Sequence, residues 1–281
     1  MRDLAYWPSA KPLSKKDKFA KNRNFIKNLH HIDQIWEKLK FKCGDTLAVC
    51  DLRGKNKEKF SYSELADLIT KVSFSFKNYG LVKGDVVTVI SENSPRWLVV
   101  DQGLMRLGAI NAVRGINSPS VELEYIIQHS NSVGLIVQSK ETWLKLNNKE
   151  EFKKRLKFII NLEDDQFESL ISWNQFISAQ EQENSKNNII EKFKPKIDDV
   201  ATILYTSGTT GKPKGVPLTH ANFLHQVINL AYIADPEPGT SVLSVLPIWH
   251  SYERSAEYFF FHAVVLNTIQ FQNFLKMILH K

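Results

Sequence analysis

Short apolar runs and longer helix-length segments alternate along the first half of the chain. The runs at 86–90, 109–113 and 133–137 are apolar and rich in β-branched residues, which is typical of buried strands. The segments 94–108 and 118–129 between them are predicted to be helices. Strands separated by helices of this length predict parallel βαβ units.

Turn and capping residues mark where these helices begin and end. Ser94 is a suitable N-cap, and Pro95 follows at the first helical position. Gly108 ends that helix, and Gly80 ends another one predicted over 63–79. The α/β alternation therefore rests on local start and stop signals as well as on periodicity.

The ten positions from Thr206 to Gly215 hold four hydroxyl residues, three glycines and two lysines. Glycines let backbone N–H groups gather round an anion, and hydroxyls and lysines add donors and positive charge. A buried strand is predicted before this loop at 200–205, and a helix after it at 221–234 with Thr219 as N-cap. Strand, glycine-rich loop and helix together predict a polyphosphate site.

The spacing within this loop is not that of a Walker A motif. Gly208 and Gly211 enclose two residues instead of four, and Pro213 follows Lys212 where Ser or Thr would be needed. An unrelated phosphate-loop NTPase is therefore a disfavoured alternative. A polar loop without a ligand is the other alternative.

The net charge of +7 is concentrated in residues 1–40, which hold ten Lys/Arg and four Asp/Glu. A basic amphipathic arm attracts anionic lipid, so one interpretation is a peripheral membrane contact through these residues. In the alternative, the helix packs on its own domain and its lysines are solvated. The apolar helical face comprises Leu29, Ile32, Ile35, Trp36 and Leu39. Nucleic acid is not an expected partner, because no other basic stripe with interleaved aromatics is present.

The chain has 281 residues, of which 43% are hydrophobic, so it can bury a substantial core. Neither a signal peptide nor a run long enough for a transmembrane helix is visible, which makes the cytosol the default location. Cys43 and Cys50 lack a metal-binding spacing and are expected to stay reduced. Strands are predicted at 46–50 and 59–62, and the polar segment 181–199 is predicted to be an exposed linker.

Residues 205–216 read Tyr-Thr-Ser-Gly-Thr-Thr-Gly-Lys-Pro-Lys-Gly-Val, which resembles the phosphate-loop motif of the AMP-forming adenylating superfamily. This superfamily includes acyl-CoA synthetases, luciferases and peptide-synthetase adenylation domains. Phe-Ser-Tyr-Ser-Glu-Leu at 60–65 resembles an early element of the family. Lys-Gly-Asp-Val-Val at 83–87 and Ser-Glu-Asn-Ser-Pro-Arg-Trp at 91–97 resemble a later strand-to-helix block.

Two segments narrow the resemblance to one branch of the superfamily. Leu-Pro-Ile-Trp-His-Ser-Tyr-Glu-Arg at 246–254 is most similar to long-chain fatty-acid ligases. Ala-Val-Arg-Gly at 112–115 is similar to the members of that group that use acyl carrier protein.

The resemblance implies an α/β fold, a partial N-terminal domain of the acyl-adenylating fold with parallel βαβ units and flanking helices. Residues 1–40 would be a basic helical arm, and 41–262 an incomplete AMP-binding domain. The small C-terminal domain of the family would be absent. Residues 263–281 resemble nothing in the family, and we interpret them as an aberrant, out-of-frame tail of a truncated gene. We therefore expect this chain to be inactive by itself.

The family reaction joins a fatty acid to AMP from ATP, releases pyrophosphate, and transfers the acyl group to CoA or acyl carrier protein. The resemblance implies ATP and Mg²⁺ as cofactors, with Thr206 as a metal ligand and Lys214 as the catalytic counter-charge. The residues that would wrap the β- and γ-phosphates are Ser207, Gly208, Thr209, Thr210 and Gly211. A non-catalytic remnant that only binds nucleotide remains an alternative.

The same resemblance assigns an acyl side of the site to residues near 250. His250 would be catalytic and would contact substrate where adenylate meets acyl chain, while Trp249 and Tyr252 would line the acyl tunnel. A hydrogen-bonded structural histidine is the alternative for His250. Glu253 and Arg254 could contact substrate. In the alternative, they pair with adjacent charges or mark the start of a helix.

Overall fold

The contacts of the computed structural model divide the chain into two compact units. Unit 1 comprises Met1–Leu68, Asn93–Pro95 and His220–Lys281, and unit 2 comprises Ile69–Glu92 and Arg96–Thr219. The residues that the structure describes are 29, 31–51, 57–167, 170–178, 194–206, 212–230, 241–262 and 266–269. The expected exposed linker at 181–199 thus lies largely outside the described residues.

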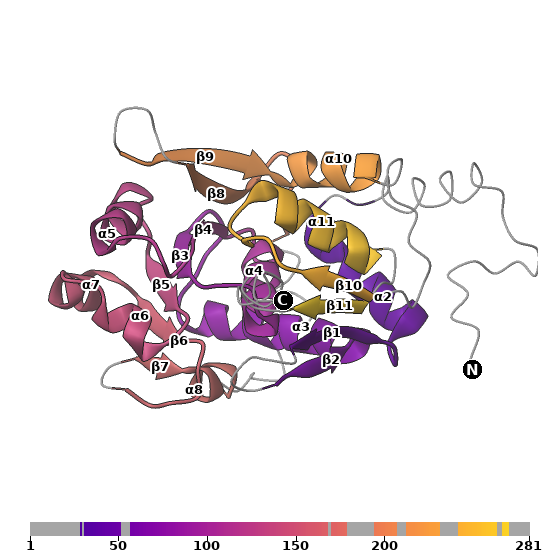
Figure 1. Cartoon of the computed structure of the whole chain (residues 1–281), viewed down its shortest axis with the longest axis horizontal. Helices are drawn as coiled ribbons and strands as arrows, with labels where there is room; N and C mark the ends of the chain where they lie inside the picture. The colour runs from indigo at the N-terminus through magenta and orange to yellow at the C-terminus, as the bar shows by residue number, and fades with distance from the viewer. Residues whose placement is uncertain are drawn as a thin grey trace, which may run out of the picture. The chain divides into compact units, whose positions relative to one another are not determined.

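Unit 2 is built on a seven-stranded sheet with the order β7-β6-β5-β3-β4-β8-β9 (Figure 1). Every neighbouring pair of strands is parallel except β8 and β9. The strands are β3 (Val86–Ile90), β4 (Ile110–Arg114), β5 (Gly134–Val137), β6 (Phe158–Asn161), β7 (Ile171–Ser172), β8 (Val200–Thr206) and β9 (Lys214–Thr219). The predicted parallel βαβ units are confirmed, and their strands lie within one residue of the predicted bounds.

Helices connect the parallel strands of this sheet. They are α4 (Pro95–Arg106), α5 (Ser120–His129), α6 (Lys140–Leu144), α7 (Lys149–Arg155) and α8 (Trp173–Ile177), while α3 (Tyr62–Asn78) runs from unit 1 into unit 2. Gly80 and Gly108 have φ angles of 80° and 65°. This left-handed conformation follows α3 and α4, as the sequence predicts.

The direction of the crossovers reverses between β3 and β4. Helix α4 connects β3 to β4, whereas α5 connects β4 to β5 on the other side of β3. Because crossovers between parallel strands are right-handed, opposite directions place α4 and α5 on opposite faces of the sheet. Open α/β sheets bind ligands outside the carboxyl ends of the strands at such a reversal.

One strand of unit 2 was not predicted from the sequence. The sequence predicts strand, loop and helix, but Lys214–Thr219 forms a second strand, β9, antiparallel to β8. Helix α10 (His220–Leu230) follows β9 and confirms the predicted helix within one residue of its expected start. The phosphate motif therefore connects two strands of a hairpin and does not end at a helix N-terminus. Strand β9 lies at the sheet edge and none of its residues is fully buried, so its sequence lacks the apolar run by which a buried strand is recognised.

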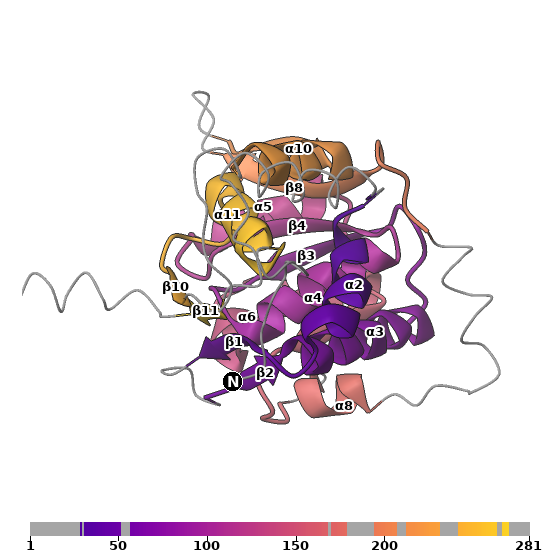
Figure 2. The same cartoon turned by 90° about the vertical axis from the view of Figure 1, so that its right-hand side faces the viewer.

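Unit 1 contains a four-stranded sheet with the order β10-β11-β1-β2. Its strands are β1 (Leu47–Asp51), β2 (Lys59–Ser61), β10 (Ser241–Ser244) and β11 (Leu266–Ile269), and its helices include η1 (Ile32–Gln34), α2 (Ile35–Cys43), α10 and α11 (Ser251–His262). Helices α10 and α11 lie side by side (Figure 2). Strand β11 pairs in parallel with both β1 and β10, so four residues of the expected aberrant tail lie inside this sheet.

The apolar face expected in the N-terminal arm belongs to the core of unit 1. Its five side chains are all buried, with exposed fractions of 5% or less for Leu29, Ile32, Ile35, Trp36 and Leu39. Trp36 packs on Phe261 of α11 with 5.2 Å between ring centroids, and the Tyr62 hydroxyl donates to the Phe261 carbonyl oxygen (3.2 Å). This burial supports the alternative in which the helix packs on its own domain.

Candidate functional site

Charged and hydroxyl side chains lie at the carboxyl ends of three adjacent strands in unit 2. Strand β4 lies between β3 and β8, with Ile90 opposite Arg114 and Val113 opposite Leu204. Glu92 follows β3, Arg114 ends β4, and Thr206 ends β8. These positions lie at the reversal of strand order, where ligands bind in open α/β sheets.

Thr206 and Lys214 face each other at the mouth of the β8–β9 hairpin. They are register partners in the antiparallel pair, and both are exposed. The side chain of Lys212, also exposed, places its ammonium nitrogen 5.9 Å from the ring centroid of Tyr125. A hydroxyl and two ammonium groups at one mouth form a donor set suited to an anion. The predicted phosphate-wrapping residues between them, 207–211, lie outside the described residues.

Two aromatic side chains of α5, the partly buried Tyr125 and the exposed His129, contact the buried Tyr205 at the end of β8. The Tyr205 hydroxyl is hydrogen-bonded to His129 Nδ1 (2.9 Å), and the His129 ring stacks on Tyr125 with 5.0 Å between centroids. Burial, with a smaller effect of Tyr125, raises the pKa of Tyr205 to about 12. A Cβ on Gly215 would lie 2.9 Å from Ile203 Cγ2 and 3.3 Å from the Tyr205 ring. Gly215 therefore has a packing role in the motif.

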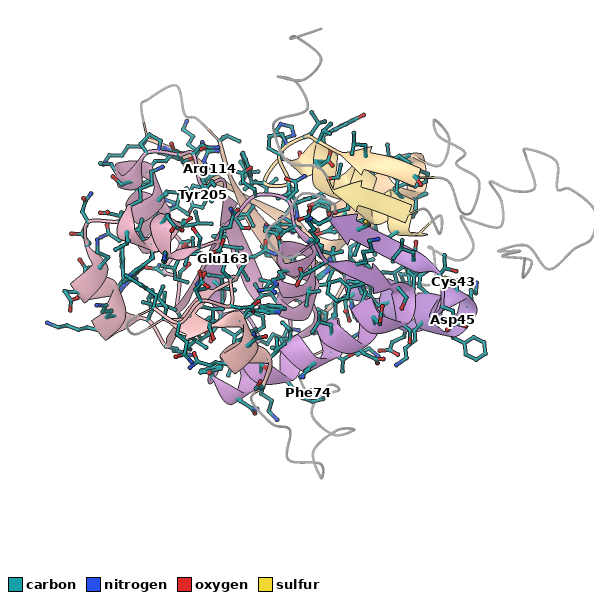
Figure 3. All side chains as sticks on the ribbon, turned by 60° about the horizontal axis from the view of Figure 1, so that its bottom comes forward. Cys43, Asp45, Phe74, Arg114, Glu163 and Tyr205 are labelled. Carbon is teal, nitrogen blue, oxygen red and sulfur yellow. The ribbon has the colours of Figure 1, made fainter. Side chains whose placement is uncertain are left out.

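Arg114 holds the end of β8 in place. Its guanidinium donates to the Tyr205 carbonyl oxygen (3.0 Å) and to Ser118 Oγ (3.0 Å), and it pairs with Glu122 at 2.6 Å. Figure 3 labels Arg114 beside Tyr205. The residue after Tyr205 is Thr206, so Arg114 fixes the start of the phosphate motif. From the sequence alone, Arg114 is identified only as part of the segment that resembles one branch of the family. An arginine at the end of a buried strand is the signal that could have suggested a role in the site.

Glu92 is a buried carboxyl group at the same end of the sheet. Its side chain is 5% exposed, and Oε1 accepts a hydrogen bond from the Ile116 backbone N–H (3.3 Å). Burial raises its pKa to about 7, although the hydrogen bond from Ile116 works in the opposite direction. Sequence reasoning did not single out Glu92, because its burial depends on distant segments.

Unit 1 presents the residues assigned to the acyl side on the turn between β10 and α11. His250 is exposed and stands just before α11. Its Nδ1 accepts a hydrogen bond from the Tyr252 backbone N–H (3.3 Å), and its carbonyl oxygen accepts one from the Arg254 N–H (3.3 Å). An accepting Nδ1 places the proton of the neutral imidazole on Nε2. Trp249 is half-buried, and Tyr252 is 61% exposed.

The two charged residues that follow are interior groups. Glu253 is 7% exposed and accepts a hydrogen bond from Ser244 Oγ (2.6 Å); burial raises its pKa. Arg254 is fully buried, with its guanidinium carbon 5.0 Å from the Phe223 ring centroid and its nitrogens 3.1–3.2 Å from the Tyr258 hydroxyl. Glu253 lies in the first turn of α11, as the helix-start alternative expects, and both side chains are held inside unit 1 by these contacts.

Further expectations concern metals, cysteines and membranes. Over the described part of the chain, no group of three or more His, Cys, Asp or Glu side chains is placed to hold a metal ion. Cys43 and Cys50 are free thiols, and burial raises the pKa of Cys43 to about 11. No helix within the described ranges is both long and apolar enough to span a bilayer.

The chain belongs to the AMP-binding enzyme family, whose model matches residues 36–272. The match extends past residue 262, where the resemblance in the sequence was expected to end. "Probable acyl-activating enzyme 16, chloroplastic" of Arabidopsis thaliana is 37% identical over 260 residues, covering 87% of this chain and 36% of the relative. A chloroplastic long-chain-fatty-acid–[acyl-carrier-protein] ligase of the same plant is 35% identical over 245 residues, covering 82% of this chain and 34% of the relative. The chain thus spans about a third of the length of these relatives.

Solved structures of similar fold support the same architecture. The N-terminal subdomain of Klebsiella oxytoca NpsA aligns with a TM-score of 0.64 at 21% identity, covering 88% of this chain and 55% of that one. A Mycobacterium tuberculosis fatty acyl CoA synthetase aligns with a TM-score of 0.69 at 17% identity, covering 88% and 47%. The predicted fold, an N-terminal domain of the adenylating type, is confirmed.

Proposed function

We propose that the protein activates long-chain fatty acids with ATP, forming an acyl-adenylate whose acyl group passes to CoA or acyl carrier protein. The observation that carries this proposal is the hairpin mouth, where Thr206 and Lys214 stand opposite each other at the carboxyl end of a parallel sheet. The two Arabidopsis relatives support the acyl substrate, since one is named an acyl-activating enzyme and the other a fatty-acid ligase.

The chemistry that this mouth would assist is displacement at the α-phosphorus of ATP by a fatty-acid carboxylate. A bond forms between the carboxylate oxygen and phosphorus, the α–β phosphoanhydride bond breaks, and pyrophosphate leaves with the electron pair. Negative charge grows on the leaving group, so fixed donors near it lower the barrier. Lys214 would supply an ammonium group there, and the loop residues 207–211 would supply backbone N–H groups.

The described residues could supply only part of a Mg²⁺ site, with the other ligands coming from phosphate and water. Thr206 offers one exposed hydroxyl, and no acidic cluster stands among the described residues. Mg²⁺ retains several waters and binds phosphate oxygens readily, so the Thr206 hydroxyl would be one ligand of a larger set. When bound, Mg²⁺ would neutralise charge on the phosphates.

Trp249, His250 and Tyr252 would form the acyl side of the site. The exposed Tyr252 and half-buried Trp249 offer apolar surface for a hydrocarbon chain. The His250 ring, held through Nδ1 by the Tyr252 N–H, would present an Nε2–H donor to the adenylate. The alternative of a purely structural His250 predicts no effect of its removal on ligand binding.

Two binding assays and one turnover assay test this proposal. The purified chain should bind Mg·ATP and a palmitoyl sulfamoyl adenosine, a stable acyl-adenylate analogue. Palmitate-dependent exchange of pyrophosphate into ATP should be measured beside the Arabidopsis ligase as positive control. Binding without exchange would assign the chain to the nucleotide-binding remnant alternative; absence of Mg·ATP binding would overturn the proposal.

A further inference from the structure

Asn93 is a buried residue of unit 1 that binds the turn leading to His250. It is 7% exposed and belongs to the short segment Asn93–Pro95, which contacts unit 1 although its chain neighbours lie in unit 2. Its Nδ2 donates to Ser244 Oγ (2.9 Å) and to the Leu246 carbonyl oxygen (2.8 Å), and its Oδ1 accepts from the Ile248 N–H (3.0 Å). The Asn93 side chain therefore hydrogen-bonds both acceptors and a donor of residues 244–248.

These three bonds use the asparagine amide almost completely. An amide side chain has two N–H donors and one carbonyl oxygen, and all three groups of Asn93 are engaged. A carboxylate in the same place would lack both donors, and a hydroxyl could not reach three partners. A buried donor or acceptor that loses its partner is destabilising, so this position requires an amide side chain.

The turn depends on these polar contacts because it has little apolar burial of its own. Val245 is 42% exposed and Leu246 is 45% exposed, so neither anchors the turn in the core. Ile248, at 1% exposure, is the one buried apolar side chain of residues 244–248. Hydrogen bonds, together with the buried Ile248, therefore set the path of the chain from β10 to Trp249.

Glu253 provides a second anchor from the first turn of α11. Ser244 Oγ accepts from Asn93 and donates to Glu253 Oε1 (2.6 Å), and Glu253 also hydrogen-bonds the Leu246 backbone. The turn is thus held on one side by Asn93 and on the other by the helix that begins after His250.

We propose that Asn93 is a positioning residue for the acyl side of the site, acting through the 244–248 turn on Trp249 and His250. This inference rests on the proposed function, because it assumes that those two side chains contact the acyl-adenylate. Its distinctive consequence is selectivity: losing Asn93 should disturb recognition of the acyl-adenylate while leaving ATP recognition at the β8–β9 hairpin intact.

Calorimetric binding of two probes, Mg·ATP and palmitoyl sulfamoyl adenosine, tests this selectivity. Asn93→Ala should weaken binding of the analogue about ten- to hundredfold and leave Mg·ATP binding within about twofold. The matched control is Asn161→Ala, which removes a buried asparagine of unit 2 with two hydrogen bonds, to Asp165 and Glu163. Equal weakening of both probes, or of neither, would overturn the inference.

A double-mutant cycle shows whether Asn93 acts through His250. In the His250→Ala background, Asn93→Ala should cost far less analogue affinity than in the wild type, because the positioned group is already absent. Full additivity would contradict the inference. A wild-type chain that binds neither probe would instead refute the proposed function, so the two failures are distinguishable.

A milder variant covers the case in which Asn93→Ala does not fold. Ser244→Ala removes one oxygen and leaves the Asn93 bonds to Leu246 and Ile248 in place. It should still weaken the analogue selectively, by about threefold or more. Unchanged analogue binding in a folded Ser244→Ala chain would count against the inference.

Discussion

The β8–β9 hairpin of unit 2 and the 244–254 segment of unit 1 differ in where their supporting residues lie, outside the motif or within it. In the hairpin, the motif residues Thr206 and Lys214 are exposed, and Arg114 and His129, which lie outside the motif, hydrogen-bond the neighbouring Tyr205. In the 244–254 segment, the motif itself supplies buried support through Glu253 and Arg254. A conspicuous motif is therefore no guide to whether each of its residues contacts a ligand or holds the fold.

The largest effect should come from Lys214→Ala in the hairpin. If Lys214 stabilises leaving pyrophosphate, its loss should lower palmitate-dependent exchange in an active form of the protein by about 10²–10³-fold. Because Lys214 is exposed, the unfolding free energy should change by less than about 0.5 kcal/mol. Exchange kinetics and urea denaturation of the same preparation measure both quantities.

Lys212→Ala is the matched control for this change. Lys212 is an exposed lysine two residues away, near the Tyr125 ring, and its removal deletes the same charge. It should cost less than about tenfold in exchange. If the two lysines proved equivalent, general positive charge, and not Lys214 in its register with Thr206, would explain nucleotide binding.

The second prediction concerns Arg254, the opposite case. Arg254→Ala should lower the unfolding free energy by about 3–5 kcal/mol, because it leaves a cavity against Phe223 and removes donors from the buried Tyr258 hydroxyl. Urea denaturation followed by circular dichroism measures the loss. A stable variant that no longer bound the acyl-adenylate analogue would move Arg254 from the scaffold to the site.

The sequence predicts much of the fold because its signals are local. The run at 86–90 and the turn residues Gly80 and Gly108 act on their immediate neighbours, and the structure has them as predicted. Strand β9 was missed because it forms only by pairing with β8, and its exposed side chains carry no buried-strand pattern. The position of β11 between β1 and β10 likewise depends on distant partners.

From the sequence, the site could be predicted only where a local motif identifies the residues without knowledge of their tertiary contacts. Thr206 and Lys214 are recognised from the motif that surrounds them in the sequence. Their roles in ligand binding stay predictions. Arg114 acts on a residue 91 positions away, and Asn93 on one 155 positions away. No local pattern encodes such pairs, so the support of the site had to come from the fold.

The third prediction uses the buried carboxyl group of Glu92. Burial raises its folded-state pKa from 4.5 to about 7, so the folded protein holds this proton more tightly than the unfolded chain. The associated stability is full below about pH 4.5 and is lost as the pH rises to about 7, by about 3 kcal/mol at most. Glu92→Gln, which cannot ionise, should lack this component.

Urea denaturation at pH 5 and pH 8 isolates the effect. The unfolding free energy of the wild type, taken relative to Glu92→Gln, should be higher at pH 5 than at pH 8. The difference between the two proteins removes contributions from other groups, such as Glu253. A constant difference across this range would mean that Glu92 is already ionised in the folded protein at pH 5.

The smallest expected effect is that of Gly215→Ala, which tests whether this glycine supports the hairpin or contacts the ligand. Gly215→Ala would bring a Cβ to 2.9 Å from Ile203 Cγ2 and 3.3 Å from the Tyr205 ring, so β9 or the ring must shift. Ile203 Cγ2 lies on a stiff β-branched side chain, and we expect a loss of about 1 kcal/mol in unfolding free energy. Because Tyr205 adjoins Thr206, Mg·ATP binding should weaken as well, by a few-fold. Thermal denaturation and calorimetry of Gly215→Ala beside Lys212→Ala measure both effects. Weakened binding without lost stability would place Gly215 with the ligand-contacting residues; lost stability with weakened binding would make it part of the support, as its packing indicates.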